Sequence, residues 1–218
     1  MHPAMSSENG VHTLPEHLQA FALMHVGMRR DARRLVDAAP NVTPGTASAL
    51  NSWWRQLHDV IDWHHRSEDD VLWPSLRALV PEFGAIEREM LHDHSALEES
   101  MAQVSANMRR STGMAALAPA AHRFHQILVD HLRHEEAAIF PVLAGNLTIA
   151  QYTSIEQRII GSAPPRVMSY LQPWMFDEAD PSVTRQVGAG IPTPLRLLGN
   201  TLLRIRYQRT VDPVLALR

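Results

Sequence analysis

The sequence predicts an all-α protein whose main part is an up-and-down antiparallel four-helix bundle. Apolar residues recur at alternating steps of three and four in four separate stretches, as in helices that bury one stripe. Short connections between these stretches favour antiparallel neighbours, and no stretch has the alternating pattern of a strand. We expect a flexible lead-in over residues 1–13, the bundle over residues 14–146, and a C-terminal helical extension over residues 147–218.

Prolines and capping residues set the expected ends of the first two helices. Pro15 suits the first turn of the first helix, which is expected to end near Pro40. Thr43-Pro44 is typical of an N-cap followed by the first helical residue. The second helix is then expected to continue until Pro74 breaks it.

The third and fourth helices follow the same logic. The third stripe extends from Ile86 to Met108, and the Ser-Thr-Gly sequence at 111–113 is expected to end it. The fourth stripe begins near Leu117 and is expected to end at Pro141.

The extension has a different composition. Thr148 and Gln151 have capping-box spacing, which predicts a helix to about Ile160, and a proline-rich irregular stretch follows. An amphipathic helix is predicted over 195–207, and residues 191–218 contain five Arg against one Asp. We expect this helix to pack its apolar face onto the bundle. The alternative left open is a module that binds a membrane surface or a partner protein.

Composition excludes several classes of function. The 218 residues are 45% apolar, enough to bury a core, and the net charge of −3 gives no electrostatic basis for nucleic-acid binding. The absence of Cys excludes disulfides, thiolate catalysis and iron–sulfur ligation. No apolar run approaches the roughly 18 residues of a membrane span, and the N-terminus has no hydrophobic signal core. A soluble cytoplasmic protein is therefore expected.

One motif occurs twice, near the ends of the second and fourth predicted helices. In each copy a Glu follows a His by four residues, and an aromatic-Pro pair ends the motif. The copies are His64 and Glu68 before Trp73-Pro74, and His131 and Glu135 before Phe140-Pro141. Because positions i and i+4 share a helix face, each copy directs an imidazole and a carboxylate at one point. These are ligands that first-row metals accept.

Polar residues interrupt the apolar stripes at positions that the pattern assigns to the core. Every helix contributes one His, and the second and fourth add a Glu. The set is His25, His64, Glu68, His94, His131 and Glu135. Burying such a set without a cation costs several kcal/mol for each charged group. The sequence therefore predicts a metal centre between the four helices.

The ligand types favour a dinuclear centre. Glu68 and Glu135 would bridge two ions, together with an oxo or hydroxo group, and imidazole and carboxylate ligands suit iron or manganese. With four His as terminal ligands, roughly two of the positions around two octahedral ions stay open to a small ligand. The alternative is a mononuclear zinc or nickel centre with three His ligands. Whether His65, Met90, His92 or Glu136 completes the site stays open, although His65 is one step off the stripe and His92 is expected to face solvent.

This pattern resembles the hemerythrin-like family of HHE cation-binding domains over about residues 14–146. The order H…HxxxE…H…HxxxE and the aromatic-Pro pair after each HxxxE are similar to the family's. The resemblance implies a four-helix bundle around a centre of two non-haem iron ions, in preference to manganese or zinc, that binds O₂ or reacts with peroxide or nitric oxide.

Two departures from the oxygen-carrying members bear on function. Those members have HxxxH in the third helix and HxxxxD in the fourth, whereas here Met90 precedes His94 by four residues and the last carboxylate is Glu135. The lost His implies a second open coordination position, which disfavours simple oxygen storage. The expected function is binding or conversion of O₂, H₂O₂ or NO, either as catalase-like peroxide decomposition or as sensing.

Overall fold

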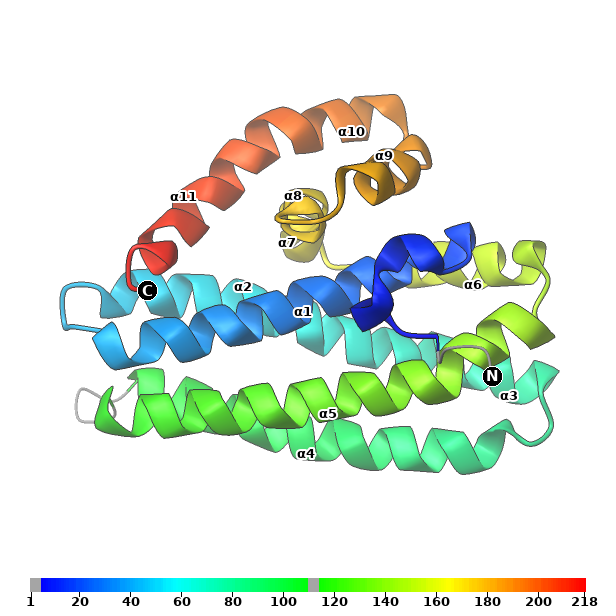
Figure 1. The fold of residues 1–218 in the computed structure, drawn as a ribbon, viewed down its shortest axis with the longest axis horizontal. Helices are drawn as coiled ribbons and strands as arrows, with labels where there is room; N and C mark the ends of the chain where they lie inside the picture. The colour runs from blue at the N-terminus through cyan, green and yellow to red at the C-terminus, as the bar shows by residue number, and fades with distance from the viewer. Residues whose placement is uncertain (1–4, 110–113) are drawn as a thin grey trace.

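The computed structural model describes residues 5–109 and 114–218, and within these ranges every regular element is helical. Four long helices lie side by side and alternate in direction along the chain (Figure 1). They are α1 (Gln19–Ala38), α2 (Ala47–Ser67), α4 (Phe83–Arg109) and α5 (Met114–Asn146). The predicted all-α bundle is confirmed. The expected stop of the third helix at 111–113 lies outside the described residues.

The second helix does not break at Pro74. After α2 the chain makes a π-helical turn, Glu68–Leu72, and continues as α3, Trp73–Leu79. Pro74 occupies the first turn of α3, where its missing N–H does little harm. The helical path therefore continues beyond the metal-ligand positions and carries Trp73 into the core.

Pro141 also fails to end its helix, because α5 continues to Asn146. A proline inside a helix removes one hydrogen bond and costs about 3 kcal/mol. Phe140 and Leu143 lie on either side of it and are fully buried, and burying two large apolar side chains offsets a cost of this size.

The expected flexible lead-in takes a different form in its described part. Residues 5–13 contain two short 3₁₀ helices, Ser7–Asn9 and Val11–Thr13, in which Ser7 and Val11 are buried. Hydrogen bonds from Ser6 and Ser7 to Glu136 of α5 hold this segment on the bundle. A third short helix, Glu16–Leu18, leads into α1.

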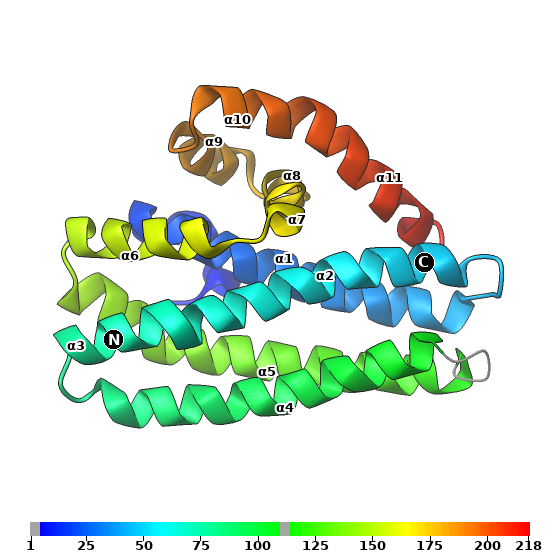
Figure 2. The same cartoon turned by 180° about the vertical axis from the view of Figure 1, so that it is seen from behind.

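The extension packs across the bundle (Figures 1 and 2). The capping box of Thr148 and Gln151 starts α6 as predicted. Short helices occupy the stretch expected to be irregular, and the chain then returns as an arch. The elements are α6 (Ile149–Ser162), α7 (Pro165–Met168), α8 (Leu171–Phe176), α9 (Pro181–Ala189), α10 (Thr193–Leu198), a π-helical turn (Gly199–Leu203) and α11 (Arg204–Leu215).

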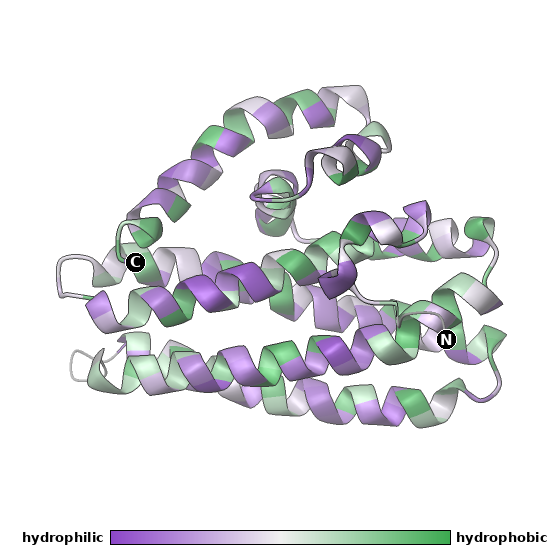
Figure 3. Cartoon of the chain, in the orientation of Figure 1, coloured by the Kyte–Doolittle hydropathy of each residue, from purple (hydrophilic) through white to green (hydrophobic). Residues whose placement is uncertain are grey.

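Hydrophobic and hydrophilic residues are mixed along α10 and α11 (Figure 3). Contrary to our expectation, most large apolar side chains of the Arg-rich helix do not pack on the bundle. The buried side chains of α11 are Tyr207, Val211 and Val214, which lie on another side of the helix. The outward side chains are 39–66% exposed. They are Leu195, Leu197, Leu198, Leu202 and Ile205. Among the described residues, no helix combines the length and the apolar character that crossing a membrane requires.

Candidate metal centre

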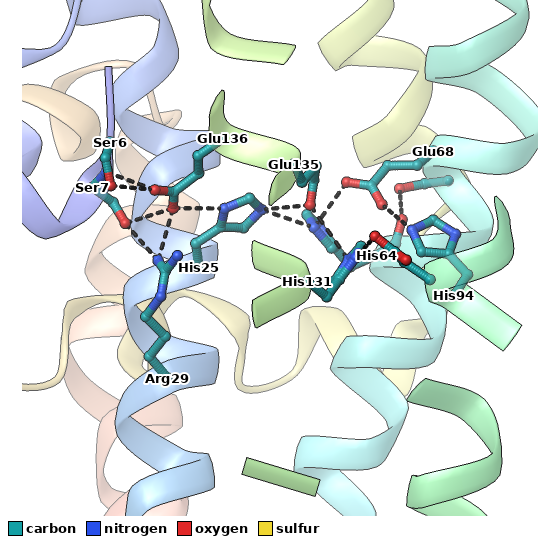
Figure 4. Close-up of polar contacts among 12 residues, drawn as sticks. Ser6, Ser7, His25, Arg29, His64, Glu68, His94, His131, Glu135 and Glu136 are labelled. Carbon is teal, nitrogen blue, oxygen red and sulfur yellow. Dashed lines mark hydrogen bonds and ion pairs between the residues drawn. The ribbon is translucent and has the colours of Figure 1, made fainter. Parts of the chain in front are cut away.

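The four long helices bring the six predicted ligands to one place inside the bundle (Figure 4). Each of the six is at most 7% exposed, although all are polar. α1 supplies His25, α4 supplies His94, and the two HxxxE copies come from α2 with its π-helical turn and from α5.

One half of the centre is formed by His25, His64, Glu68 and Glu135. One ligand atom from each lies within 4.8 Å of the others. The Nε2 atoms of His25 and His64 are 3.2 Å apart, and Glu68 Oε1 is 2.9 Å from His64 Nε2. Atoms this close, drawn from three helices, could share one ion.

The other half contains His94 and His131, together with His65, whose role as a further ligand the sequence left open. His65 is buried, its ring stacks on that of His94 with centroids 4.2 Å apart, and its centroid is 5.1 Å from that of His131. The three rings offer nitrogen atoms that lie within 4.8 Å of one another.

A signal for His65 was present in the sequence. Trp53 and Trp54 precede His64 and His65 by eleven residues, which is about three helical turns. Both Trp side chains are buried, so α2 buries two adjacent positions along its length. The adjacent Trp residues therefore indicated that α2 buries a face wider than a single stripe, one that includes His65.

The two carboxylates span both halves. Glu68 places Oε1 2.9 Å from His64 Nε2 and Oε2 3.4 Å from His94 Nε2. Glu135 Oε2 is 3.5 Å from His25 Nε2 and 3.5 Å from His131 Nε2. Each carboxylate thus lies near His side chains of both halves, Glu68 through both of its oxygens and Glu135 through Oε2 alone.

Three further carboxylates face the outer nitrogens of the His rings. Glu136 accepts a hydrogen bond from His25 Nδ1 at 3.0 Å and Asp69 accepts one from His94 Nδ1 at 3.0 Å. Asp93 lies 4.0 Å from His131 Nδ1. Glu136 and Asp69 fix the orientation of the rings that they hydrogen-bond and leave Nε2 available for a metal. His131 Nδ1 makes no hydrogen bond, so Asp93 acts on it only through its charge. The sequence reasoning left Glu136 open and did not single out Asp69 or Asp93, yet each directly follows or precedes a predicted ligand.

Charge within the buried site is unbalanced without a cation. Burial opposes ionisation of Glu68, but the nearby positive charges of His64 and His94 hold its pKa well below its ordinary value. Burial and the charge of Glu68 raise the pKa of Glu135 well above its ordinary value. Burial also lowers the pKa of His25 to about 4. A cation between the two glutamates would allow both to ionise.

The unpaired atoms of the site fit a metal. Within the described chain, both carboxylate oxygens of Glu68 and of Glu135 are buried without a hydrogen bond, as is Nε2 of His65, His94 and His131. Leaving such groups unpaired is costly, and nitrogen and oxygen donors of this kind are those that iron accepts.

The two halves have different surroundings. Phe21 packs on His25 and His64, with ring centroids 4.9 and 5.4 Å away, and Phe140 stacks on His25 at 6.1 Å. On the opposite side, a cavity of about 280 Å³ is lined by His65 and His94 together with polar side chains of α2 and α4. The first half is therefore covered by aromatic rings and the second borders a polar cavity.

An all-α bundle with His and Glu side chains converging from all four helices defines a metal-binding four-helix protein. The model of the hemerythrin HHE cation binding domain matches residues 16–143, which is more than half of the chain. The chain therefore belongs to this family, and the resemblance expected over residues 14–146 is confirmed. Membership implies metal binding, typically of iron. Comparison with curated proteins and with solved structures gave no match.

Proposed function

We propose that this chain holds two non-haem iron ions and uses them to bind or react with a small oxidant or gas, namely O₂, H₂O₂ or NO. The observation that supports the proposal most directly is the contact of Glu68 and Glu135 with both groups of His. A single ion needs no carboxylate that reaches two separate groups of nitrogens.

The six predicted ligands take distinct roles in this proposal. His25 and His64 hold one ion, His94 and His131 hold the other, and the two glutamates bridge them. Bound iron supplies Lewis acidity and a redox centre. Phe21 and Phe140 exclude water from one side, while Glu136 and Asp69 orient the rings of His25 and His94.

The dinuclear proposal is tested by metal content and absorption of protein purified from iron-replete cells. We expect two irons per chain and near-ultraviolet absorption, and we expect Glu68→Ala or Glu135→Ala to lose two-metal loading. The exposed Glu98 of α4 provides the control, Glu98→Ala. Retention of both irons in the Glu68 and Glu135 variants would refute the bridging roles.

One zinc or nickel per chain would instead favour the mononuclear alternative, for which His65, His94 and His131 form a ready group.

Turnover is separated from sensing by oxygen evolution. If the iron-loaded protein decomposes peroxide in a catalase-like manner, an oxygen electrode records O₂ released in proportion to the H₂O₂ consumed. A protein that only binds or senses its ligand releases essentially none, and ligand-induced spectral changes then identify the gas.

A second proposal concerns the outward face of α10, the π-helical turn and α11, which we infer to contact an anionic membrane surface. Five large apolar side chains are exposed there among four of the Arg residues. Exposed apolar side chains interspersed with Arg are typical of interfacial helices. Residues 191–218 carry +4, whereas the remaining 15 basic and 22 acidic residues sum to −7, so an anionic surface would attract this face and repel the rest.

Co-sedimentation tests the second proposal. We expect the protein to pellet with vesicles of phosphatidylcholine and phosphatidylserine but not with phosphatidylcholine alone. Leu202→Glu should prevent pelleting, whereas Leu91→Glu, at an exposed apolar position of α4, should not. Absence of pelleting ends the membrane proposal. Self-association that Leu202→Glu disrupts would assign the face to a second copy instead.

A further inference from the structure

We propose that His65 is a metal ligand, so that α2 supplies two adjacent His to the two halves of the centre, His64 to one and His65 to the other. The inference rests on the proposed dinuclear function. It adds a third nitrogen to the ion at His94 and His131.

The placement of His65 is that of a ligand rather than a packing residue. Its Nε2 is buried without a hydrogen bond, although a buried imidazole nitrogen ordinarily has a partner. A nitrogen of the same ring lies within 4.8 Å of nitrogens of His94 and His131, which also have an unpaired Nε2 each. Three rings from α2, α4 and α5, each with an unpaired Nε2 and each offering a nitrogen to this group, are explained together by one cation.

The residue one turn before His94 cannot take this place. Met90 is fully buried in an apolar cluster that includes Trp73 and Phe83. Its thioether is a soft ligand that suits copper better than iron. The α4 helix thus contributes a single nitrogen, and the neighbouring α2 helix contributes the additional one.

This assignment changes the expected reactivity of the centre. Four His left roughly two coordination positions open, and a fifth His leaves about one. The half with three His borders the polar cavity, whereas the half with two His, His25 and His64, lies against Phe21 and Phe140.

The experiment is an anaerobic Fe²⁺ titration of the full chain, with an equilibrium competitor to resolve the two affinities. The variants are His65→Ala and His65→Gln, and His92→Ala is the control because His92 is exposed on α4. We expect the wild type and the control to bind two Fe²⁺. Each His65 variant should bind one of them at least about tenfold more weakly, since even partners of ligands change metal affinity by this factor.

The outcomes separate this inference from the proposed function. Two Fe²⁺ bound with unchanged affinity in both His65 variants would overturn the ligand role of His65 and leave the dinuclear proposal standing. Fewer than two Fe²⁺ in the wild type would overturn the dinuclear proposal itself. Circular dichroism of the metal-free variants identifies those that fold. If His65→Ala does not fold, the titration of His65→Gln, whose side chain is larger, provides the test.

Mössbauer spectra give a second test, because a purely structural role of His65 would not change the spectrum of one particular iron. The wild type loaded with ⁵⁷Fe should show two doublets of equal area, because one ion has three nitrogens and the other has two. In the His65 variants the doublet of the three-nitrogen ion should change or disappear while the other persists. Two identical iron environments in the wild type would contradict the inference.

Discussion

Two successive glutamates near the metal centre have opposite roles because adjacent helical residues point about 100° apart. Glu135 faces the centre of the His cluster. Glu136 faces away from that centre but stays buried, and it accepts hydrogen bonds from Ser6, Ser7, Arg29 and His25. Burial would raise the pKa of Glu136, but the hydrogen bonds of His25 and Arg29 hold it below its ordinary value. Glu136 is therefore a buried anion that positions His25.

Glu136→Gln keeps the size of the side chain and removes its charge. We expect metal affinity to fall roughly 10- to 100-fold, as when other partners of metal-bound His are removed. The metal-free protein should lose about 3 kcal/mol of unfolding free energy, because Arg29 loses its buried partner. Metal competition and chemical denaturation measure the two effects. Glu99→Gln, on the exposed surface of α4, should change neither; equal behaviour of the two variants would contradict the positioning role.

At the scale of helices, a small residue in α1 determines how the extension docks. A Cβ atom at Gly27 would lie 2.8 Å from two ring carbons of Trp174, which belongs to α8. Trp174 is buried and donates a hydrogen bond from Nε1 to Asp31 of α1. Gly27 thus makes room for the ring that joins the extension to the bundle.

Gly27→Ala should destabilise the protein by about 1–3 kcal/mol, because the ring must shift in a packed region. Gly161→Ala in α6 is the matched control, since nothing lies within 4 Å of its Cβ position. That variant should stabilise the helix by about 0.5–1 kcal/mol, because Ala favours helices more than Gly does. Thermal unfolding of both variants measures whether their stabilities change in opposite directions. A stabilising Gly27→Ala would show that the close approach of Trp174 is unimportant.

The sequence predicted the long helices well, because their apolar stripes and caps are local signals. It did not predict the π-helical turn at Glu68–Leu72, after which Pro74 is accommodated in the first turn of α3. It did not predict the continuation of α5 past Pro141 either, because there tertiary packing outweighs the local cost of proline. The six predicted ligands converge because they interrupt regular stripes. The role of His65 stayed open because a single stripe does not reveal that α2 buries two adjacent faces.

At the scale of the whole molecule, buried charges join the extension to α1. Arg34 is buried and pairs with Asp31 of its own helix and with Asp177, which follows α8. Asp177 also accepts a hydrogen bond from Tyr207 of α11. Tyr207, Val211 and other residues of the extension belong to the same apolar core as α1 and α2. The extension is therefore attached to the bundle at a polar cluster as well as through apolar contacts.

Acid should weaken this attachment. Burial opposes ionisation of Asp177, but the charges and hydrogen bonds of Arg30 and Arg34 outweigh it and lower its pKa from 3.8. Because the folded pKa lies below the unfolded value, the stabilisation is present above about pH 4 and is lost as the pH falls further.

We therefore expect Asp177→Asn to cost about 1 kcal/mol at neutral pH, and the difference from wild type to shrink as the pH falls below 4. Denaturation curves between neutral pH and pH 3 measure this difference. Asp212→Asn changes an exposed carboxylate of α11 and should show no such dependence. A difference that stays constant or grows on acidification would contradict the assigned sign.

The contact between Ser6 and Glu136 joins residues 130 positions apart, and it orients His25. A ribosome releases the chain from its N-terminus, so His25 emerges long before the residue that fixes its ring. The α5 helix must also emerge before His131 and Glu135 can reach the centre. Metal binding at this site is therefore an event that follows synthesis of most of the chain, and a nascent chain that stalls before α5 would carry His residues without a finished site.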